Sequence, residues 1–466
     1  MLVVLAVANF MILLDNTIVT VALPTIDQKL GLSQAQLEWI VSAYALTFGV
    51  LMLTGGRLAD LLGRKLIFLI GLVTFTCASL ACGLAGSGGF LIGARVVQGI
   101  GAALMLPATL SIIPATFPKE EQGTAIGIWT GTSGLGVAIG PLVGGVLTES
   151  AGWNWVFLVN VPVGIIGAAV AISVIRESKR GARERLDLPG LLTSGVSLFA
   201  LTFALIESQS YGWGSTTVIA LLIVSVIALA LFVAVERRRT APMLDLGLFS
   251  SGTFSGANVV SVIIGMAMIS VLVFLSIFMQ RQLGYSASKT GLAFLPMTLV
   301  IIFTAPVVGK LGEKVGPRFF LSAGLVIVAV ALLLLTSISA DSGSLGLVLR
   351  LMLAGIGIGF VMPTMVAAAL AAVSPEKSGV VSGLINTSRQ LGGAIGIALT
   401  GAIIAQVAKD STADRGTAFI DGLQTALFVA AGIALFGAIV AALTVQKAAV
   451  APAVPADERK TAAPVG

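Results

Sequence analysis

Residues 56–65 read GRLADLLGRK, a short basic stretch between two apolar runs, and a variant of it, GKLGEKVGPR, returns at residues 309–318. The copies lie 253 residues apart, and both place an acidic residue between basic ones. Further glycines and a proline repeat at an offset of 256 residues, which indicates small insertions in loops. The sequence therefore predicts an internal repeat. The matching pairs are Gly99 and Gly355, Gly101 and Gly357, Pro107 and Pro363, Gly123 and Gly379, Gly127 and Gly383, Gly136 and Gly392, and Gly140 and Gly396.

Apolar windows long enough to cross a bilayer recur along the whole chain, and we count fourteen of them. The chain is 57% hydrophobic and 10% charged, against about 25% charged residues in soluble domains. A soluble protein of this composition would lack polar surface to cover its core, so we predict an all-α integral membrane protein. The predicted spans are residues 2–24, 37–56, 66–85, 89–112, 123–147, 155–175, 188–207, 216–235, 253–279, 288–309, 319–338, 345–371, 379–404 and 423–445.

Lysines and arginines are divided unequally between the loops on the two sides of this map. The loops after even-numbered spans, with the C-terminal tail, hold 19 of the 27, whereas the loops after odd-numbered spans hold 6. Cytoplasmic loops collect basic residues, so we expect both termini in the cytoplasm and a multi-pass protein of the plasma or inner membrane. This bias accounts for the net charge of +6, and we expect no nucleic acid partner.

The repeat fixes the domain organisation, because spans 2–5 pair with spans 10–13 and the repeating unit must be six helices. Two spans are left over in the middle of the chain, flanked by basic segments. Two halves around a central axis predict a binding site near the midplane of the membrane. The predicted parts are an N-terminal six-helix bundle (1–180), inserted helices 7 and 8 with basic flanking loops (181–245), a C-terminal six-helix bundle (246–445) and a disordered cytoplasmic tail (446–466).

Composition also argues against several kinds of chemistry. The chain has no histidine, which removes the commonest general base and metal ligand, and its two cysteines, Cys77 and Cys82, share one apolar helix. No glycine-rich phosphate loop is present, so ATP is not expected to drive the protein. We predict no metal site and no cofactor. Met1 is followed at once by apolar residues, which predicts no signal peptide and is compatible with a start codon further upstream.

Asp15 is, on this map, the only carboxylate deep within a span. A charged side chain at the bilayer centre costs about 2.5–3.5 kcal/mol on insertion scales. Burial disfavours the charged form of a carboxylate, so such a group can exchange a proton near neutral pH. A structural role, with Asp15 hydrogen-bonded to Thr17 or to a neighbouring helix, is the alternative. Arg95 and Arg389 also lie within spans and need a partner or water.

Seven segments together resemble the major facilitator superfamily, specifically its fourteen-span drug:proton antiporters of the quaternary-ammonium exporter type. The resemblance covers essentially the whole chain before the tail. The sequence departs from the family at Thr20, where asparagine is usual, and at Leu61 and Asn154, where a basic residue is usual. The segments are LDNTIVTVALP (14–24), GRLADLLGRK (56–65), RVVQGIG (95–101), GVAIGPLVGG (136–145), WNWVF (153–157), NVPVG (160–164) and NTSRQ (386–390).

The resemblance implies a role for each segment, and a plainer reading stands beside each one. It implies proton coupling by Asp15 and Arg95, although Arg95 could equally be a structural partner of a backbone carbonyl. It implies a cytoplasmic gate in the 56–65 loop, supported by its second copy, unless that loop only sets topology. It implies an antiporter helix at 136–145, whose close glycines could also serve packing alone. The gate residues are Gly56, Arg57, Asp60, Gly63, Arg64, Lys65 and Glu313; the antiporter-helix residues are Gly136, Gly140, Pro141, Gly144 and Gly145; the other intramembrane polar residues are Asn16, Thr17, Gln98, Asn386, Arg389 and Gln390.

The function expected from this resemblance is export of amphipathic or lipophilic compounds in exchange for protons, by a monomer in the lipid bilayer. A proton symporter or a lipid carrier on the same fold is the alternative, and the 136–145 segment argues against uptake. An integral-membrane enzyme or receptor is disfavoured, because the chain lacks histidine and clustered catalytic carboxylates. The span at 288–309 carries no acid, which weakens any claim to dicationic drugs.

Overall fold

The computed structural model describes residues 1–177, 188–239, 246–339, 344–371, 378–412 and 414–446, and these ranges contain helices and no strand. Fifteen α-helices and one short 3-10 helix, η1 (Leu246–Ser250), follow one another along them. The helices are α1 (Leu2–Leu30), α2 (Gln34–Leu62), α3 (Arg64–Gly83), α4 (Gly88–Thr116), α5 (Lys119–Ser150), α6 (Trp155–Leu158), α7 (Asn160–Val174), α8 (Leu188–Tyr211), α9 (Thr216–Arg238), α10 (Gly252–Arg281), α11 (Ala287–Val315), α12 (Pro317–Leu335), α13 (Ser344–Ala371), α14 (Ser378–Asp410) and α15 (Arg415–Thr444).

The predicted all-α membrane fold is confirmed, because α6 and α7 together form one crossing and the described helices then account for fourteen spans. Thirteen of these segments are long and apolar enough to cross a membrane, and α5 occupies the remaining predicted span. The sixth predicted span breaks at Val159, three residues before Pro162, whose nitrogen cannot donate to the carbonyl of Leu158. Several helices are longer than the predicted spans. Helix α2, for example, ends at Leu62 instead of residue 56.

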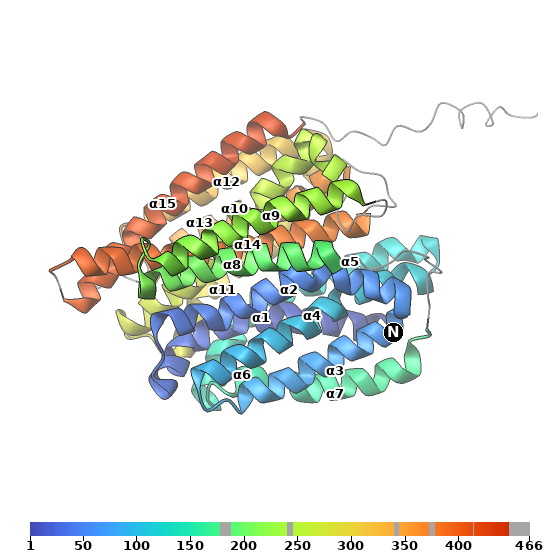
Figure 1. Ribbon diagram of the computed structural model, residues 1–466, viewed down its shortest axis with the longest axis horizontal. Coiled ribbons are helices and arrows are strands. Elements are labelled where there is room, and N and C mark those ends of the chain that lie inside the picture. Colours follow the sequence, from blue (N-terminus) through green and yellow to red (C-terminus); the bar gives the residue numbers. More distant parts are fainter. Residues whose placement is uncertain (178–187, 240–245, 340–343, 372–377, 413, 447–466) are drawn as a thin grey trace, which may run out of the picture.

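Two groups of helices lie on either side of a seam (Figure 1). Helices α1–α7 form one half and α10–α15 the other, and the halves meet where α5 packs on α11, α2 on α14 and α1 on α10. The pair α8 and α9 runs alongside this seam, with α8 against both α2 and α14. Helices α1 and α10 are buried along most of their length, whereas α9 exposes apolar side chains, as a lipid-facing helix must.

Glycine contacts recur at equivalent places in the two halves. Gly71 of α3 and Gly101 of α4 approach so closely that a Cβ on either would lie 2.8–2.9 Å from the carbonyl oxygen of the other. Gly324 of α12 and Gly357 of α13 make the same contact, at 2.7–2.9 Å. Small residues let membrane helices pack backbone to backbone, so the repeated glycines of the sequence correspond to repeated helix contacts.

The turn after α2 shows the same equivalence. Gly63 separates α2 from α3 with φ +124°, and Gly316 separates α11 from α12 with φ +94°. Both angles lie in the region that side chains other than glycine rarely adopt. The predicted loop at 56–65 is therefore helical on both sides of a single glycine hinge, and most of it extends α2.

Candidate functional site

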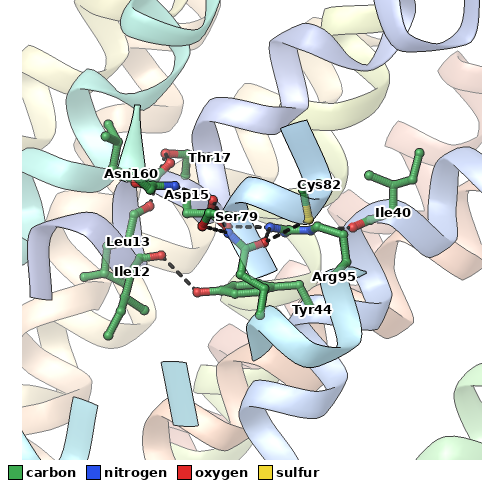
Figure 2. A network of polar contacts seen from close by, with 12 residues as sticks. Ile12, Leu13, Asp15, Thr17, Ile40, Tyr44, Ser79, Cys82, Arg95 and Asn160 are labelled. Carbon is green, nitrogen blue, oxygen red and sulfur yellow. Dashed lines mark hydrogen bonds and ion pairs between the residues drawn. The ribbon is translucent and has the colours of Figure 1, made fainter. Parts of the chain in front are cut away.

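Asp15 and Arg95 form an ion pair in the middle of the first half (Figure 2). Arg95 Nη1 donates to Asp15 Oδ2, and both side chains are fully buried. Charges removed from water are costly unless they are paired and hydrogen-bonded. The pairing explains how α1 and α4 can each hold a charged residue within the span, and Asp15 is the described carboxylate deepest in a helix.

Two amides complete the hydrogen bonding of the Asp15 carboxylate. Gln98 Nε2 and Asn160 Nδ2 both donate to Asp15 Oδ1, at 2.8 and 3.0 Å. Gln98 Nε2 also lies 2.8 Å from Ser79 Oγ, and Gln98 Oε1 accepts from Arg95 Nη1 at 2.6 Å. Helices α1, α3, α4 and α7 thus meet around one carboxylate, which Arg95, Gln98 and Asn160 hold in place.

Arg95 is held on its other side by α2. Its Nε donates to the carbonyl oxygen of Ile40 at 3.0 Å, and its guanidinium carbon lies 4.2 Å from the centre of the Tyr44 ring. The Tyr44 hydroxyl donates to the carbonyl oxygen of Ile12 at 3.1 Å, which fixes the ring beneath the guanidinium. One nitrogen, Arg95 Nη2, is buried without a hydrogen-bond partner. The cation can therefore make a further contact if the carboxylate is neutralised.

Asn16 connects this cluster to the second half of the protein. Asn16 Nδ2 donates to Gln390 Oε1 of α14 at 3.3 Å, while Asn16 Oδ1 and Gln390 Nε2 are buried and unpartnered. One turn along α14, the Thr387 hydroxyl donates to the carbonyl oxygen of Gly49 in α2 at 3.0 Å. The residue next to Asp15 thus touches the opposite half directly.

Thr17 does not bind Asp15. Its hydroxyl lies 3.2 Å from the carbonyl oxygen of Leu14 and 3.5 Å from that of Gly136 in α5. The residue serves the contact between α1 and α5 instead.

The glycines of 136–145 bring α5 against both halves. A Cβ on Gly136, Gly140 or Gly144 would collide with the backbone or side chains of α1, whereas one on Gly145 would collide with Ala287 of α11. Pro141 is buried within α5, and its carbonyl oxygen faces Gly291 of α11. Close packing is therefore their described role, and α14 makes the equivalent contact with α10 through its own repeated glycines.

The gate residues are only partly described. The carboxylate of Glu177 accepts from the backbone nitrogens of Lys65 and Leu66, each at 3.1 Å, and so caps the N-terminus of α3 beside Gly63. Lys65 Nζ donates to the carbonyl oxygen of Ile172 at 2.6 Å. A Cβ on Gly56 would lie 3.4 Å from Pro107 Cβ, and Arg57 and Arg64 also have partners. The side chains of Asp60 and Glu313 lie outside the described part of the chain.

At the end of the bundle where α1 ends, the halves are joined by polar contacts. Arg281 of α10 pairs with Asp27 of α1, and Glu149 of α5 accepts from the backbone nitrogen of Ser288 in α11 at 3.2 Å. Gln280 Nε2 donates to the carbonyl oxygen of Val21 at 2.8 Å. This end of the seam is therefore closed in the structure.

Sequence reasoning missed three members of the central cluster, namely Tyr44, Ser79 and Asn160. Asn160 opens a segment that resembles the family, and a polar residue at the start of an apolar helix was the available signal. Two further buried carboxylates, Glu38 and Glu236, lie near helix ends. Glu207 of α8 accepts from Trp39 Nε1 at 3.2 Å and joins an inserted helix to α2.

Comparisons with known proteins agree with the resemblance that the sequence motifs show. The model of the Major Facilitator Superfamily matches residues 5–397 and 257–466. The chain is 35% identical to the Puromycin resistance protein pur8 of Streptomyces alboniger, over 94% of this chain and 90% of that protein. It is 36% identical to the Multidrug resistance protein Stp of Mycobacterium tuberculosis (strain CDC 1551 / Oshkosh), over 85% and 74%. A bacterial homologue of the human lysosomal transporter Spinster, solved inward-facing and occupied, has a TM-score of 0.71 and 20% identity over 97% of this chain and 98% of that chain.

Proposed function

Since the chain belongs to the Major Facilitator Superfamily and is a multi-pass drug transporter, not an enzyme, we propose that it exports amphipathic or lipophilic compounds in exchange for protons by alternating access. The observation that carries the proposal is the buried Asp15–Arg95 pair beside Asn16, which touches the other half. In this proposal Asp15 is the proton-binding group, and its neighbour Asn16 makes the contact between the halves that must open and close. The proton gradient is the energy source, and no cofactor takes part.

The proposed coupling step is protonation of Asp15. A proton on the carboxylate removes the charge that Arg95 pairs with, and leaving a buried charge unpaired costs about 3–5 kcal/mol. One proton crossing 100 mV supplies about 2.3 kcal/mol, and each pH unit adds about 1.4 kcal/mol. The two quantities are of the same order, so one proton can drive Arg95 to a new partner and α1 to a new position.

Movement of α1 reaches both the seam and α5. Asn16 follows Asp15 directly, and Thr17 lies against Gly140. A shift of α1 therefore changes the contact with Gln390 and the packing of α5 on α11. In this proposal the contacts around Asp27 and Arg281 close the outer side, and Asp60 with Arg57, Arg64, Lys65 and Glu313 closes the cytoplasmic side.

The proposed setting is the plasma or inner membrane, with both termini in the cytoplasm and a monomer as the working unit. Tags at residues 1 and 466 test the topology, since both should resist protease in right-side-out vesicles. Cleavage of one tag alone would require an odd number of spans and overturn the map.

Drug-susceptibility profiling of an efflux-deficient strain that expresses the protein tests export itself. We expect raised resistance to several lipophilic compounds. Sensitivity equal to that of the same strain without the protein would refute export. Vesicles with an imposed pH gradient separate antiport from the alternative, a proton symporter or lipid carrier. Antiport requires drug and proton to move in opposite directions, and movement in the same direction would establish symport.

A further inference from the structure

Arg389 is a buried cation in the second half that has no carboxylate partner among the described residues. It lies in α14 with 8% of its surface exposed, and its Nη2 donates to Asn386 Oδ1 at 2.9 Å. The described ion pairs are those of Arg95 with Asp15 and of Arg281 with Asp27. An amide oxygen carries only a partial charge, so the guanidinium lacks the counter-charge that a buried cation requires.

Two side chains that meet at the seam, Gln390 next to Arg389 in α14 and Asn16 in α1, each have a polar atom without a hydrogen-bond partner. Asn386, Arg389 and Gln390 are spaced i, i+3 and i+4, which puts them on one face of α14. Gln390 is fully buried, and its Nε2 has no hydrogen-bond partner. Across the seam, Asn16 Oδ1 is buried and unpartnered as well. One spare donor and one spare acceptor therefore lie where α14 meets α1, and the Arg389 cation is the neighbouring residue on α14.

We propose that Arg389 and Gln390 bind the acidic group of the exported molecule, so that its substrates are amphiphiles carrying a carboxylate or a comparable oxyanion. This inference rests on the export proposed above and names its substrate class. The planar guanidinium matches a carboxylate with two parallel hydrogen bonds, and Gln390 Nε2 adds a third donor. Asn16 Oδ1 accepts from a hydroxyl or amine on the same ligand.

The charge balance of the interior favours this class over simple cations. The charged side chains deep in the described spans are Asp15, Arg95 and Arg389, an excess of one positive charge. Protonation of Asp15 raises the excess to two. A cationic drug beside Arg389 would meet repulsion in a medium that screens charges weakly, whereas an anionic group removes the excess. A free anion such as chloride has the same chemistry, and the test must separate it from the substrate.

Binding of a fluorescent fatty acid, dansyl-undecanoate, and of its methyl ester to the whole protein in nanodiscs of uncharged lipid tests the proposal. We expect Arg389→Gln to weaken binding of the acid about 10- to 100-fold, as loss of a hydrogen bond between charged groups does. Binding of the ester should change less than about twofold, since the ester forms no charge-assisted hydrogen bond. Arg350→Gln, with the same chemical change near the start of α13, should alter neither.

Two further variants keep the test decisive if Arg389→Gln does not fold. Arg389→Lys retains the charge and should keep part of the preference for the acid, whereas Gln390→Leu keeps Arg389 and should reduce that preference. Equal losses for acid and ester, or no loss for the acid, would overturn the inference. Chloride-dependent binding without any preference for the acid would do so too, by assigning the site to a free anion. If the acid is preferred but the wild-type protein exports no compound, the proposed function fails separately.

Discussion

Gly140→Ala should disturb transport through the contact between α5 and α1. A Cβ at this position would overlap Thr17 Oγ1 and come 2.9 Å from Thr17 Cβ and 3.2 Å from the backbone nitrogen of Ile18. The hydroxyl can rotate, but the Cβ and the backbone cannot, so one helix must shift by several tenths of an ångström. Asp15 lies two residues before Thr17, and the shift would displace its carboxylate from Arg95.

The size of the effect follows from two opposing terms. Overpacking a well-packed interior costs about 1–3 kcal/mol, while replacing a helical glycine with alanine gains up to about 1 kcal/mol. A net loss of about 1–2 kcal/mol corresponds to a shift of about 5- to 30-fold in an equilibrium between packings. Transport should therefore fall severalfold, with a lower melting temperature and near-normal expression.

The assay is drug-driven proton release from vesicles, with thermal unfolding of the purified protein beside it. Gly432→Ala in α15 is the matched control, because a Cβ there meets nothing within 4 Å. That variant should keep transport and melting temperature. Thr17→Ala in the Gly140→Ala background removes the overlapping hydroxyl and should restore part of the loss. Unchanged transport and stability in Gly140→Ala would refute the close contact and the reasoning built on it.

Three further perturbations follow. Arg95→Gln leaves the Asp15 charge buried and should destabilise the protein by about 3–5 kcal/mol in unfolding experiments; the double variant with Asp15→Asn should be more stable than Arg95→Gln, and equal instability would contradict the pairing. Asp27→Asn breaks a partly exposed pair with Arg281, a change of about 0–1 kcal/mol. Labelling from the outer side of a cysteine introduced at this end of the seam should therefore rise at most about fivefold. Complete loss of transport would contradict this small effect. Hydrogen bonds from the Thr417 hydroxyl and from two backbone nitrogens hold the pKa of Asp414 below its usual range. Its cap on α15 therefore stabilises the helix above the unfolded pKa and is lost as pH falls through the lower folded value. Protection of the first-turn amides against exchange, corrected for the intrinsic rate at each pH, should therefore fall in acid, but not in Asp414→Asn.

Hydropathy and the internal repeat were sufficient to predict the fourteen crossings, because membrane helices must satisfy their backbone within each apolar segment. The charged loop at 56–65 identified the repeat, and its glycine hinge recurs at Gly316 with positive φ. Helix lengths were harder to predict from the sequence. Helix α2, for example, continues to Leu62 because the helical backbone extends beyond the apolar window. The break at Val159 needed the position of Pro162 as well as hydropathy.

The candidate site could be predicted from the sequence only in part. A carboxylate and an arginine in apolar spans had to find partners, and in the structure Asp15 and Arg95 pair with each other. Their other partners depend on how each helix is rotated about its axis, and helices that are apolar on every side give little signal of that rotation. Asn160, 145 residues away from Asp15, therefore could not be assigned from spacing. The roles of the gate residues and of the antiporter helix stay predictions.

Drug-induced proton release from energised inside-out vesicles carrying Asp15→Asn tests the central claim most directly. The amide keeps the shape of the carboxyl group and cannot bind or release a proton. The variant should fold and bind drug, but adding drug should release no protons. Asp421→Asn, the same chemical change on an exposed residue of α15, should behave as the wild type. Proton-coupled efflux that persists in Asp15→Asn would contradict the account and assign the coupling group elsewhere.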